Sequence, residues 1–225
     1  MSYYTDSGKR GFSTLELTVV ITVSILLTVM AVPSITSALR NYRSVGDGRS
    51  LTEAVSVAKI RAAAAFTESR VYADLSLNQY RVETWSVPLL PTGSVSKCWV
   101  TDGDQYCSSH YTSPSTPPSI ALSPTVTFGY GSLSSPPTGT QTTLGQAPAC
   151  QSDAQKTAGT VGSVANSACV VFNSRGIPVD YTLTATAANA LYLNDTSGVY
   201  GVTILATGLI QTWRTDLNSA NWTKR

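Results

Sequence analysis

The sequence predicts an α+β protein in which one long N-terminal helix packs on an antiparallel β-rich globular head. Three observations lead to this prediction. An apolar run with a single charged residue lies close to the start of the chain. Beyond Ser69 apolar and polar residues alternate as in strands, whereas before it they recur every three or four residues as in a helix. Four cysteines lie in the C-terminal part of the chain, where two disulfides would cross-link the head.

The apolar run extends from Phe12 to Val32. As a helix it would be about 31 Å long, which matches the roughly 30 Å hydrocarbon core of a bilayer. Glu16 is its only ionisable residue, and a carboxylate in hydrocarbon is costly enough to indicate a function and a partner. If the chain were cut after Gly11, the new α-amine of Phe12 would be a cation. The amine of one copy could then neutralise Glu16 of a neighbouring copy, which predicts a polymer.

We expect the helix to start at residue 12 and to be kinked by Pro33, because proline removes a helical hydrogen bond. The Gly46-Asp47-Gly48 stretch should weaken or break the helix. From Ser50 onward apolar residues again recur at helical spacing, and this half should pack its apolar stripe on a sheet. The expected divisions are a leader at 1–11, a transmembrane and assembly helix at 12–45, and a head at 46–225 that includes an amphipathic half-helix at 50–70.

The head should consist mainly of short strands. Alternation and β-branched runs predict them at Tyr80–Trp85, Trp99-Val100, Ile120–Phe128 (interrupted by Pro124), Ala168–Phe172, Tyr181–Thr186, Leu191–Leu193, Val199–Ala206 and Leu209–Trp213. Turn-forming residues at 173–176 and 194–198 separate several of them. Two stretches rich in Ser, Thr, Pro and Gly, at 112–119 and 132–148, should be surface loops or extended segments.

Composition narrows the class of protein. Only 12% of the 225 residues are charged and the net charge is +2, which is typical of a secreted β-rich protein and predicts no bulk attraction to nucleic acid. Three arginines follow the apolar run, at positions 40, 43 and 49, so the positive-inside count does not orient the span. The even number of cysteines does, because it indicates an oxidising compartment for the head.

The four cysteines allow three pairings, and their order favours Cys98–Cys107 and Cys150–Cys169. A zinc site at Cys98, Cys107 and His110 is the alternative, but a fourth nearby ligand is missing. Asp102 and Asp104 lack the spaced oxygen ligands of a calcium loop. We therefore expect no metal and no cofactor. Because His110 is the only histidine and no nucleophile motif flanks it, we expect no enzyme.

Gly11-Phe12-Ser13-Thr14-Leu15-Glu16 resembles the processing site of type IV prepilins and pseudopilins. The resemblance implies that a prepilin peptidase cuts after Gly11 and N-methylates Phe12. Glu16 would then be the fifth mature residue and Pro33 the twenty-second, two positions at which this family carries these residues. In the family, the fifth-position glutamate serves subunit assembly.

A second resemblance lies near the C-terminus. The segments 169–176 and 201–210 resemble the C-terminal region of H-type general-secretion pseudopilins and FimT-type minor pilins, whereas residues 88–167 match nothing that we recognise. The resemblance implies a type IV pilin-like lollipop fold. It also implies a minor pilin or pseudopilin that polymerises through its helix into a type IV pilus or a type II secretion pseudopilus. The expected partners are prepilin peptidase, other subunits and an inner-membrane assembly platform, with a single-pass membrane location and a periplasmic head.

Two alternatives remain. FimT-type proteins include DNA-binding members with a Gly-Arg-x-Arg pattern in the C-terminal tail, but Gly208 is followed here by Leu-Ile-Gln. Arg214, Lys224 and Arg225 offer few basic contacts, so nucleic acid is not expected as a partner. The other alternative is a secreted or anchored β-domain without a filament role, cut near Ala31 or Ala38. Glu16 argues against it, since a signal segment does not carry a carboxylate inside its apolar run.

Overall fold

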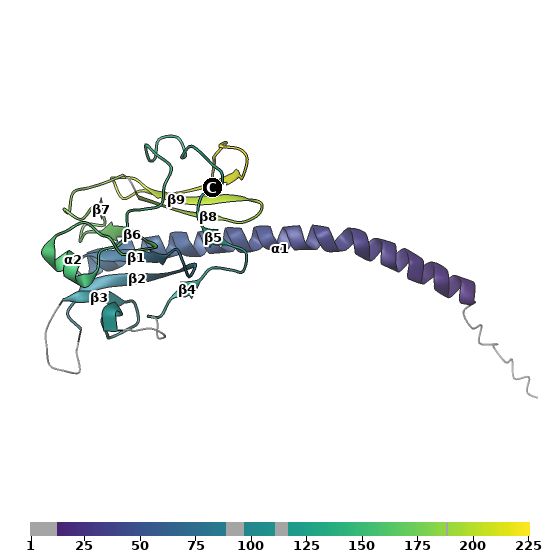
Figure 1. Cartoon of the computed structure of the whole chain (residues 1–225), viewed down its shortest axis with the longest axis horizontal. Helices are drawn as coiled ribbons and strands as arrows, with labels where there is room; N and C mark the ends of the chain where they lie inside the picture. The colour runs from purple at the N-terminus through teal and green to yellow at the C-terminus, as the bar shows by residue number, and fades with distance from the viewer. Residues whose placement is uncertain (1–12, 89–96, 111–116, 188) are drawn as a thin grey trace, which may run out of the picture. The chain divides into compact units, whose positions relative to one another are not determined.

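The structure is a computed structural model that describes residues 13–88, 97–110, 117–187 and 189–225. The described chain divides into two units, an N-terminal unit that ends at Leu39 and a head that begins at Arg40. The helix α1, Thr14–Ala64, begins in the first unit and ends in the second (Figure 1). The α+β class, with a long N-terminal helix, an antiparallel head and two disulfides, is confirmed.

The predicted break at Gly46-Asp47-Gly48 is wrong, because α1 runs through this stretch without interruption. Gly48 lies where the ring of Tyr200 comes so close that a Cβ would overlap it. Asp47 accepts hydrogen bonds from the backbone nitrogen and the hydroxyl of Ser123, at 2.9 and 3.0 Å. The glycine therefore serves a close approach between helix and sheet, and tertiary packing overrides its low helix propensity.

The helix ends at Ala64, earlier than the predicted residue 70. Phe66 adopts a left-handed backbone with φ of 50°, and the nitrogen of Thr67 donates to the carbonyl of Ala62 at 3.2 Å. This is the hydrogen-bond pattern of a Schellman helix terminus. The chain then enters a strand at Ser69, so no room is left for a further helical turn.

The head contains two antiparallel sheets. The first has the order β3-β2-β1-β6-β7, with β4 also paired to β2, and the second has the order β11-β10-β9-β8-β5 (Figure 1). The strands of the first sheet are β1 Ser69–Asp74, β2 Gln79–Ser86, β3 Cys98–Thr101, β4 Ile120–Ala121, β6 Ser167–Phe172 and β7 Pro178–Val179. Those of the second are β5 Thr127–Phe128, β8 Asn189–Asn194, β9 Gly198–Ile204, β10 Ile210–Asp216 and β11 Thr223–Lys224. A 3₁₀ turn, η1 Ser108–His110, and a short helix, α2 Asp153–Ala158, complete the head.

The head portion of α1 and the two sheets share one hydrophobic core. The helix contributes the stripe that its periodicity predicts, and both sheets contribute alternate residues from their inner faces. The members are Leu51, Ala54, Val55, Ala58 and Ala62 from α1, Val71, Ala73, Tyr80, Ala168, Val170 and Phe172 from the first sheet, and Leu191, Leu193, Tyr200, Val202 and Ile204 from the second. The prediction that this half of the helix packs on a β-rich head is confirmed.

Three strand predictions need correction. The segment 120–128 is divided between the two sheets, because β4 ends at Ala121 and pairs with β2, whereas β5 begins at Thr127 and pairs with β8. The segment 181–186 is a turn and not a strand, since the Asp180 carboxylate accepts from the backbone nitrogens of Thr182 and Thr184 at 2.8 and 3.0 Å. Strand β1 was not predicted at all, although it is the central strand between β2 and β6.

The two segments that carry the C-terminal resemblance meet at one point of α1. The Lys59 amine donates to the carbonyl oxygen of Gly208 at 2.9 Å. A Cβ at Gly208 would lie 2.5 Å from the carbonyl oxygen of Gly176. The turn after β6 and the turn after β9 are therefore held against each other and against the helix, which joins the two sheets at this end of the head.

Candidate functional site

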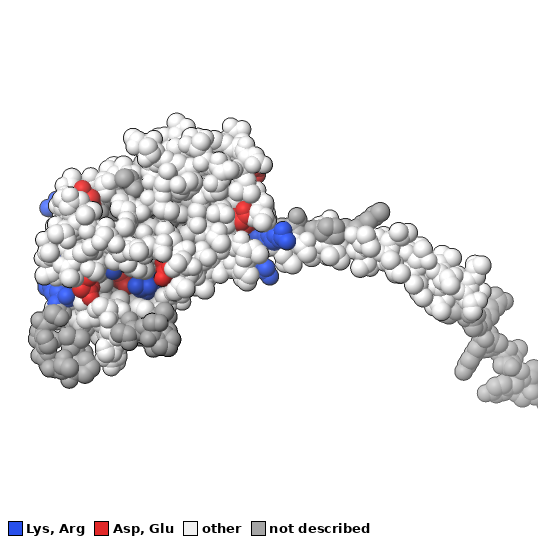
Figure 2. All heavy atoms as spheres, viewed as in Figure 1, with Lys and Arg blue, Asp and Glu red and all other residues white. Residues whose placement is uncertain are grey.

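The N-terminal unit presents an apolar helical surface that has no partner within the described part of the chain. Its large apolar side chains point in all directions, and each is between 49% and 73% exposed. They are Leu15, Leu17, Val19, Val20, Ile21, Val23, Ile25, Leu26, Leu27, Val29, Val32, Ile35 and Leu39. A helix that is apolar on all sides normally lies in a protein core or in a membrane. Its surface in Figure 2 is correspondingly free of charged side chains on the face that is shown.

Four hydroxyl groups of this segment are satisfied inside the helix. Thr18, Thr22, Ser24 and Thr28 each donate to a backbone carbonyl three or four residues earlier, all at 2.8 Å. A hydroxyl paired in this way costs little to transfer out of water. These four hydroxyl groups therefore add little to the cost of placing the segment in apolar surroundings.

Glu16 lies in the first turn of α1 and is exposed. Its negative charge is favoured there by the positive end of the helix dipole. Within the described residues its carboxylate forms no hydrogen bond and no ion pair. A charged group on an otherwise apolar surface calls for a cation supplied by another molecule, because the transfer of an unpaired carboxylate into an apolar environment is costly.

The other predicted residues of this region can be placed only in part. Gly11 and Phe12, the predicted cleavage and methylation positions, lie outside the described residues. The backbone of α1 is helical through Pro33, so this proline does not end the helix, and the kink stays a prediction.

The head contains a buried ionic network that the sequence analysis missed. Arg70 of β1 and Arg81 of β2 donate through their Nε atoms to the two carboxylate oxygens of Glu83, at 2.6 and 2.8 Å. The Glu83 side chain is fully buried. Arg70 stacks over Trp99 and Arg81 over Tyr72, each 3.9 Å from the ring centroid. The one sequence signal for this network is the alternation in β2, which places Arg81 and Glu83 on the same face of the strand.

Burial by itself would raise the pKa of the Glu83 carboxyl. The adjacent Arg70 and Arg81 guanidinium groups and a hydrogen bond from Ser108 outweigh burial and hold this pKa below its ordinary value. The network is therefore charged at neutral pH. It contributes to the packing of the outer face of the first sheet, and its carboxylate is inaccessible to solvent.

The two disulfides lie beside this network. The structure pairs Cys98 with Cys107 and Cys150 with Cys169, the pairs that chain order favours. Cys98 and Cys107, the two cysteines of the alternative zinc site, are thus joined in a disulfide and are not free to bind a metal as thiolates. Asp102, of the calcium alternative, forms an ion pair with Arg61 at 2.9 Å. Among the described residues no group of three potential metal-binding side chains comes together.

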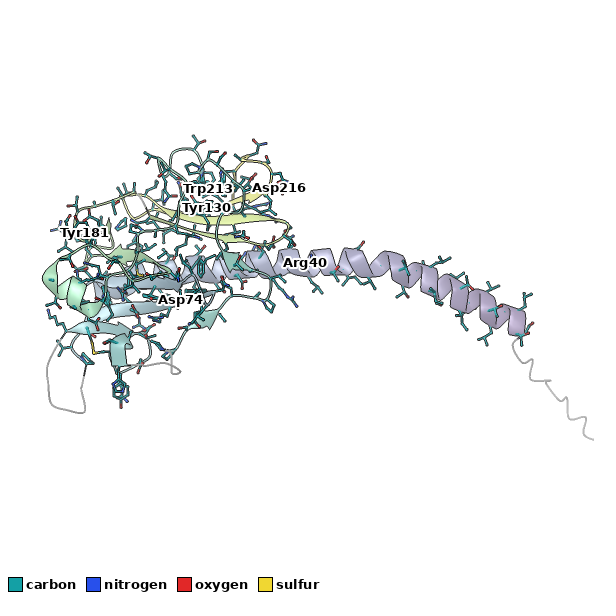
Figure 3. The ribbon with its side chains drawn as sticks, viewed as in Figure 1. Arg40, Asp74, Tyr130, Tyr181, Trp213 and Asp216 are labelled. Atoms are coloured by element: carbon teal, nitrogen blue, oxygen red, sulfur yellow. A yellow bond between two sulfur atoms is a disulfide. The ribbon has the colours of Figure 1, made fainter. Side chains whose placement is uncertain are left out.

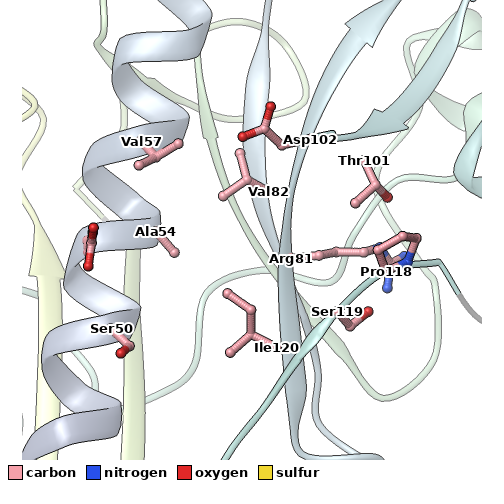
Figure 4. A pocket seen from close by; sticks show the side chains of 11 residues that line it. Ser50, Ala54, Val57, Arg81, Val82, Thr101, Asp102, Pro118, Ser119 and Ile120 are labelled. Atoms are coloured by element: carbon pink, nitrogen blue, oxygen red, sulfur yellow. The ribbon is translucent and has the colours of Figure 1, made fainter. Parts of the chain in front are cut away.

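A cavity of about 470 Å³ opens between α1 and the edge of β2, where β3 and β4 leave a gap (Figure 4). Ala54, Val57 and Val82 supply apolar walls, and Arg81 and Asp102 supply charged ones. Arg81 is bound to Glu83 and Asp102 to Arg61. The lining contains no histidine or cysteine, and we assign no reaction to it.

The basic residues near the C-terminus do not form one surface. Trp213 pairs with Lys224, and Arg214 pairs with Thr223, in the β10–β11 ladder. Because successive residues of a strand point to opposite faces, Arg214 and Lys224 lie on opposite faces. The nitrogen of Arg225 donates to the carbonyl of Thr212 at 2.9 Å, which places Arg225 on the face of Arg214. The predicted aromatic and basic tail is therefore split between two faces.

By length and composition, α1 is the one helix of the described residues that could cross a membrane. No protein-family model matches the chain, and no curated protein matches it. A search of solved structures finds the crystal structure of the minor pseudopilin EPSH from the type II secretion system of Vibrio cholerae. The two chains are 10% identical, the match covers 76% of this chain and 92% of that chain, and the TM-score is 0.36. A likeness of this size does not assign the chain to a family.

Proposed function

We propose that this chain is a structural subunit, a minor pilin or pseudopilin, that polymerises through its N-terminal helix into a type IV pilus or a type II secretion pseudopilus. The observation that carries the proposal is the position of Glu16. Within the described residues it is a carboxylate without a partner on an apolar helical surface, and it is the fifth residue when Phe12 is counted as the first. A neighbouring copy with an α-amine at Phe12 would supply the missing cation.

In this proposal a prepilin peptidase removes residues 1–11 and methylates Phe12. The helix anchors the subunit in the inner membrane, with the head in the periplasm, until an assembly platform transfers it to the filament. Two disulfides in the head support an oxidising compartment. The role is structural and not catalytic.

A second candidate, DNA uptake, has less support. Phosphate binding scales with the number of basic groups that reach one nucleic-acid backbone. Arg214 and Lys224 point to opposite faces of the β10–β11 ladder, so a single strand would meet only part of the tail.

Mass spectrometry of the purified mature chain tests the proposal. We expect an N-terminus at Phe12 that carries one additional methyl group. Replacement of Gly11 by leucine should leave a full-length membrane form, because the peptidase would no longer accept the site. A mature N-terminus near Val32 or Leu39 would instead indicate an ordinary signal peptide and a β-domain without a filament role.

A further inference from the structure

Two large apolar side chains of the head occupy backbone positions that normally favour glycine. Phe66 follows the last turn of α1 with φ of 50°, and Leu183 has φ of 65° in the turn after β7. Left-handed backbone is unfavourable for bulky residues and is retained where the surroundings or the function require it. Neither side chain gains burial in return, since Phe66 is 88% exposed and Leu183 is 55% exposed.

Both positions are built firmly. The Schellman hydrogen bond from Thr67 to Ala62 holds Phe66. The Leu183 nitrogen donates to the carbonyl of Asp180 at 3.1 Å, within the turn that the Asp180 carboxylate caps. The two residues are therefore displayed by rigid turns, and their exposure is a property of the fold.

Phe66 and Leu183 line one surface hollow of about 460 Å³, together with Trp85, Lys97 and Arg175. We call these five residues the end patch. Lys97 and Arg175 are exposed and form no ion pair within the described residues. The one acid of the hollow, Glu68, is already paired with Lys156 at 2.5 Å. Thr67, Asn173 and Ser174 also line the hollow. The end patch thus sets two exposed apolar side chains beside two cations, which fits an apolar side chain that stands beside a carboxylate.

An exposed apolar side chain beside a carboxylate lies at the opposite end of β1, in the turn that leads to β2. In the β1–β2 turn, residues 74–78, Leu77 is 57% exposed. Its backbone nitrogen donates to Oδ1 of Asp74 at 2.9 Å, and Asp74 forms no ion pair within the described part of the chain. β1 has 6 residues, so the turn and the end patch of one copy are separated by about 20 Å. Figure 3 labels Asp74 and Tyr181, which lies two residues before Leu183, and the two labelled residues are well apart in this view.

We propose that the end patch binds the β1–β2 turn of a second copy of this chain. Leu77 would enter the hollow between Phe66 and Leu183, and Asp74 would pair with Lys97. The two surfaces differ and lie at different ends of the head, so the contact is heterologous. Such contacts form closed rings or open filaments, and an open filament is the form that the proposed function requires. This inference rests on the proposed function and deepens it, since it names a contact between heads that adds to the one between helices.

A zero-length carbodiimide cross-linker tests the contact on filaments sheared from cells that produce the full chain. It joins an amine to a carboxylate only where the two touch. A link between Lys97 and Asp74 cannot form within one copy across about 20 Å, so its detection by mass spectrometry identifies the contact between copies. We expect this link, and we expect no link between Asp74 and Lys224.

The double variant Phe66→Gly with Leu183→Gly separates a role of these side chains in assembly from a role in the stability of the head. Glycine relieves both left-handed positions, so the melting temperature should be unchanged or higher. The ratio of filament to membrane protein should nevertheless fall about tenfold or more, as when a buried interface anchor is truncated. The control is Val161→Ser, which removes another exposed apolar side chain outside both surfaces and should assemble like the parent.

Parent filaments without the Lys97–Asp74 link would overturn the contact. So would a link from Lys97 to a different protein, or a double variant that assembles like the parent. Each of these results would leave the proposed function in place. A parent chain that never enters filaments would instead refute the proposed function, and the contact with it.

Discussion

Gly48 of α1 lies directly against the ring of Tyr200 of β9. A Cβ at position 48 would stand 2.5 Å from Cε1 of this tyrosine, well inside the ordinary contact distance between carbon atoms. Two residues away, Gly46 has nothing within 4 Å of the corresponding position. The two glycines lie in one helix and in one motif, yet they have different roles, and only packing against the second sheet distinguishes them.

Gly48→Ala should therefore destabilise the head, whereas Gly46→Ala should not. At position 48 the added methyl overpacks the contact with Tyr200, at a cost of about 1–3 kcal/mol. At position 46 the methyl meets open space, and the higher helix propensity of alanine should add up to about 1 kcal/mol of stability. Denaturant unfolding of both variants beside the parent measures the difference. Equal effects of the two substitutions would contradict this account of the Gly-Asp-Gly motif.

Gly208→Ala tests the junction at which both sheets meet α1. Gly208 and Gly139 both have left-handed φ values, 79° and 77°, so alanine costs about 1–2 kcal/mol of conformational strain at either position. A Cβ at 208 would additionally press on the carbonyl oxygen of Gly176, whereas nothing lies within 4 Å at 139. We expect Gly208→Ala to lower the unfolding free energy by about 1–3 kcal/mol more than Gly139→Ala. If the two variants unfold alike, the contact between the two turns contributes nothing.

Glu83→Gln should be destabilising in a pH-dependent way. At neutral pH it leaves two buried guanidinium groups without their anion, at a cost of about 3–5 kcal/mol. The folded-state pKa of Glu83 lies below its ordinary value, so the network stabilises the head fully above the unfolded-state pKa of about 4.3. That contribution is lost as the pH falls from there through the folded-state pKa.

The difference in unfolding free energy between parent and Glu83→Gln should consequently shrink below about pH 4. Glu53→Gln is the control, because Glu53 is exposed and in the described residues has no ion-pair partner; its difference from the parent should be small at every pH. A Glu83→Gln variant as stable as the parent at pH 7 would show that the network contributes no stability.

Much of this architecture follows from local sequence. The helix, its apolar N-terminal half and the stripe from Leu51 to Ala62 depend on residue spacing, which a sequence displays directly. The same holds for β6, with its unbroken apolar run 168–172, and for β9, which is rich in β-branched residues. Chain order favours the Cys98–Cys107 and Cys150–Cys169 pairs.

The sequence does not predict the features that depend on contacts between residues far apart in the chain. Gly48 resembles a helix breaker until Tyr200, from another strand, is brought against it. Strand β1 contains the charged residues Arg70 and Asp74, and only its pairing with β2 and β6 makes it the central strand. Burial of Glu83 requires two arginines, one of them from a neighbouring strand. Phe66 and Leu183 occupy left-handed turn positions, which normally hold glycine. Large apolar residues are expected in the core, so the sequence does not predict that these two are exposed.

In the proposed filament, the Glu16 carboxylate is required for contact between subunits and not for insertion of the helix into the membrane. Glu16→Ala removes the one charge of the apolar segment, so insertion into the membrane should be equal or better. In a filament the same change leaves the α-amine of a neighbouring Phe12 unpaired in an apolar bundle. Loss of one partner of a buried pair costs about 3–5 kcal/mol, which corresponds to a loss of incorporation of two orders of magnitude or more.

The most direct measurement is the ratio of filament to membrane protein for Glu16→Ala and Glu16→Gln beside the parent. We expect Glu16→Ala to be produced, processed and retained in the membrane yet to be missing from sheared filaments. Glu16→Gln should be intermediate at best, because an amide can accept a hydrogen bond from the amine but cannot neutralise it. If Glu16→Ala enters filaments as well as the parent does, Glu16 is not the assembly residue and the helix is an anchor only.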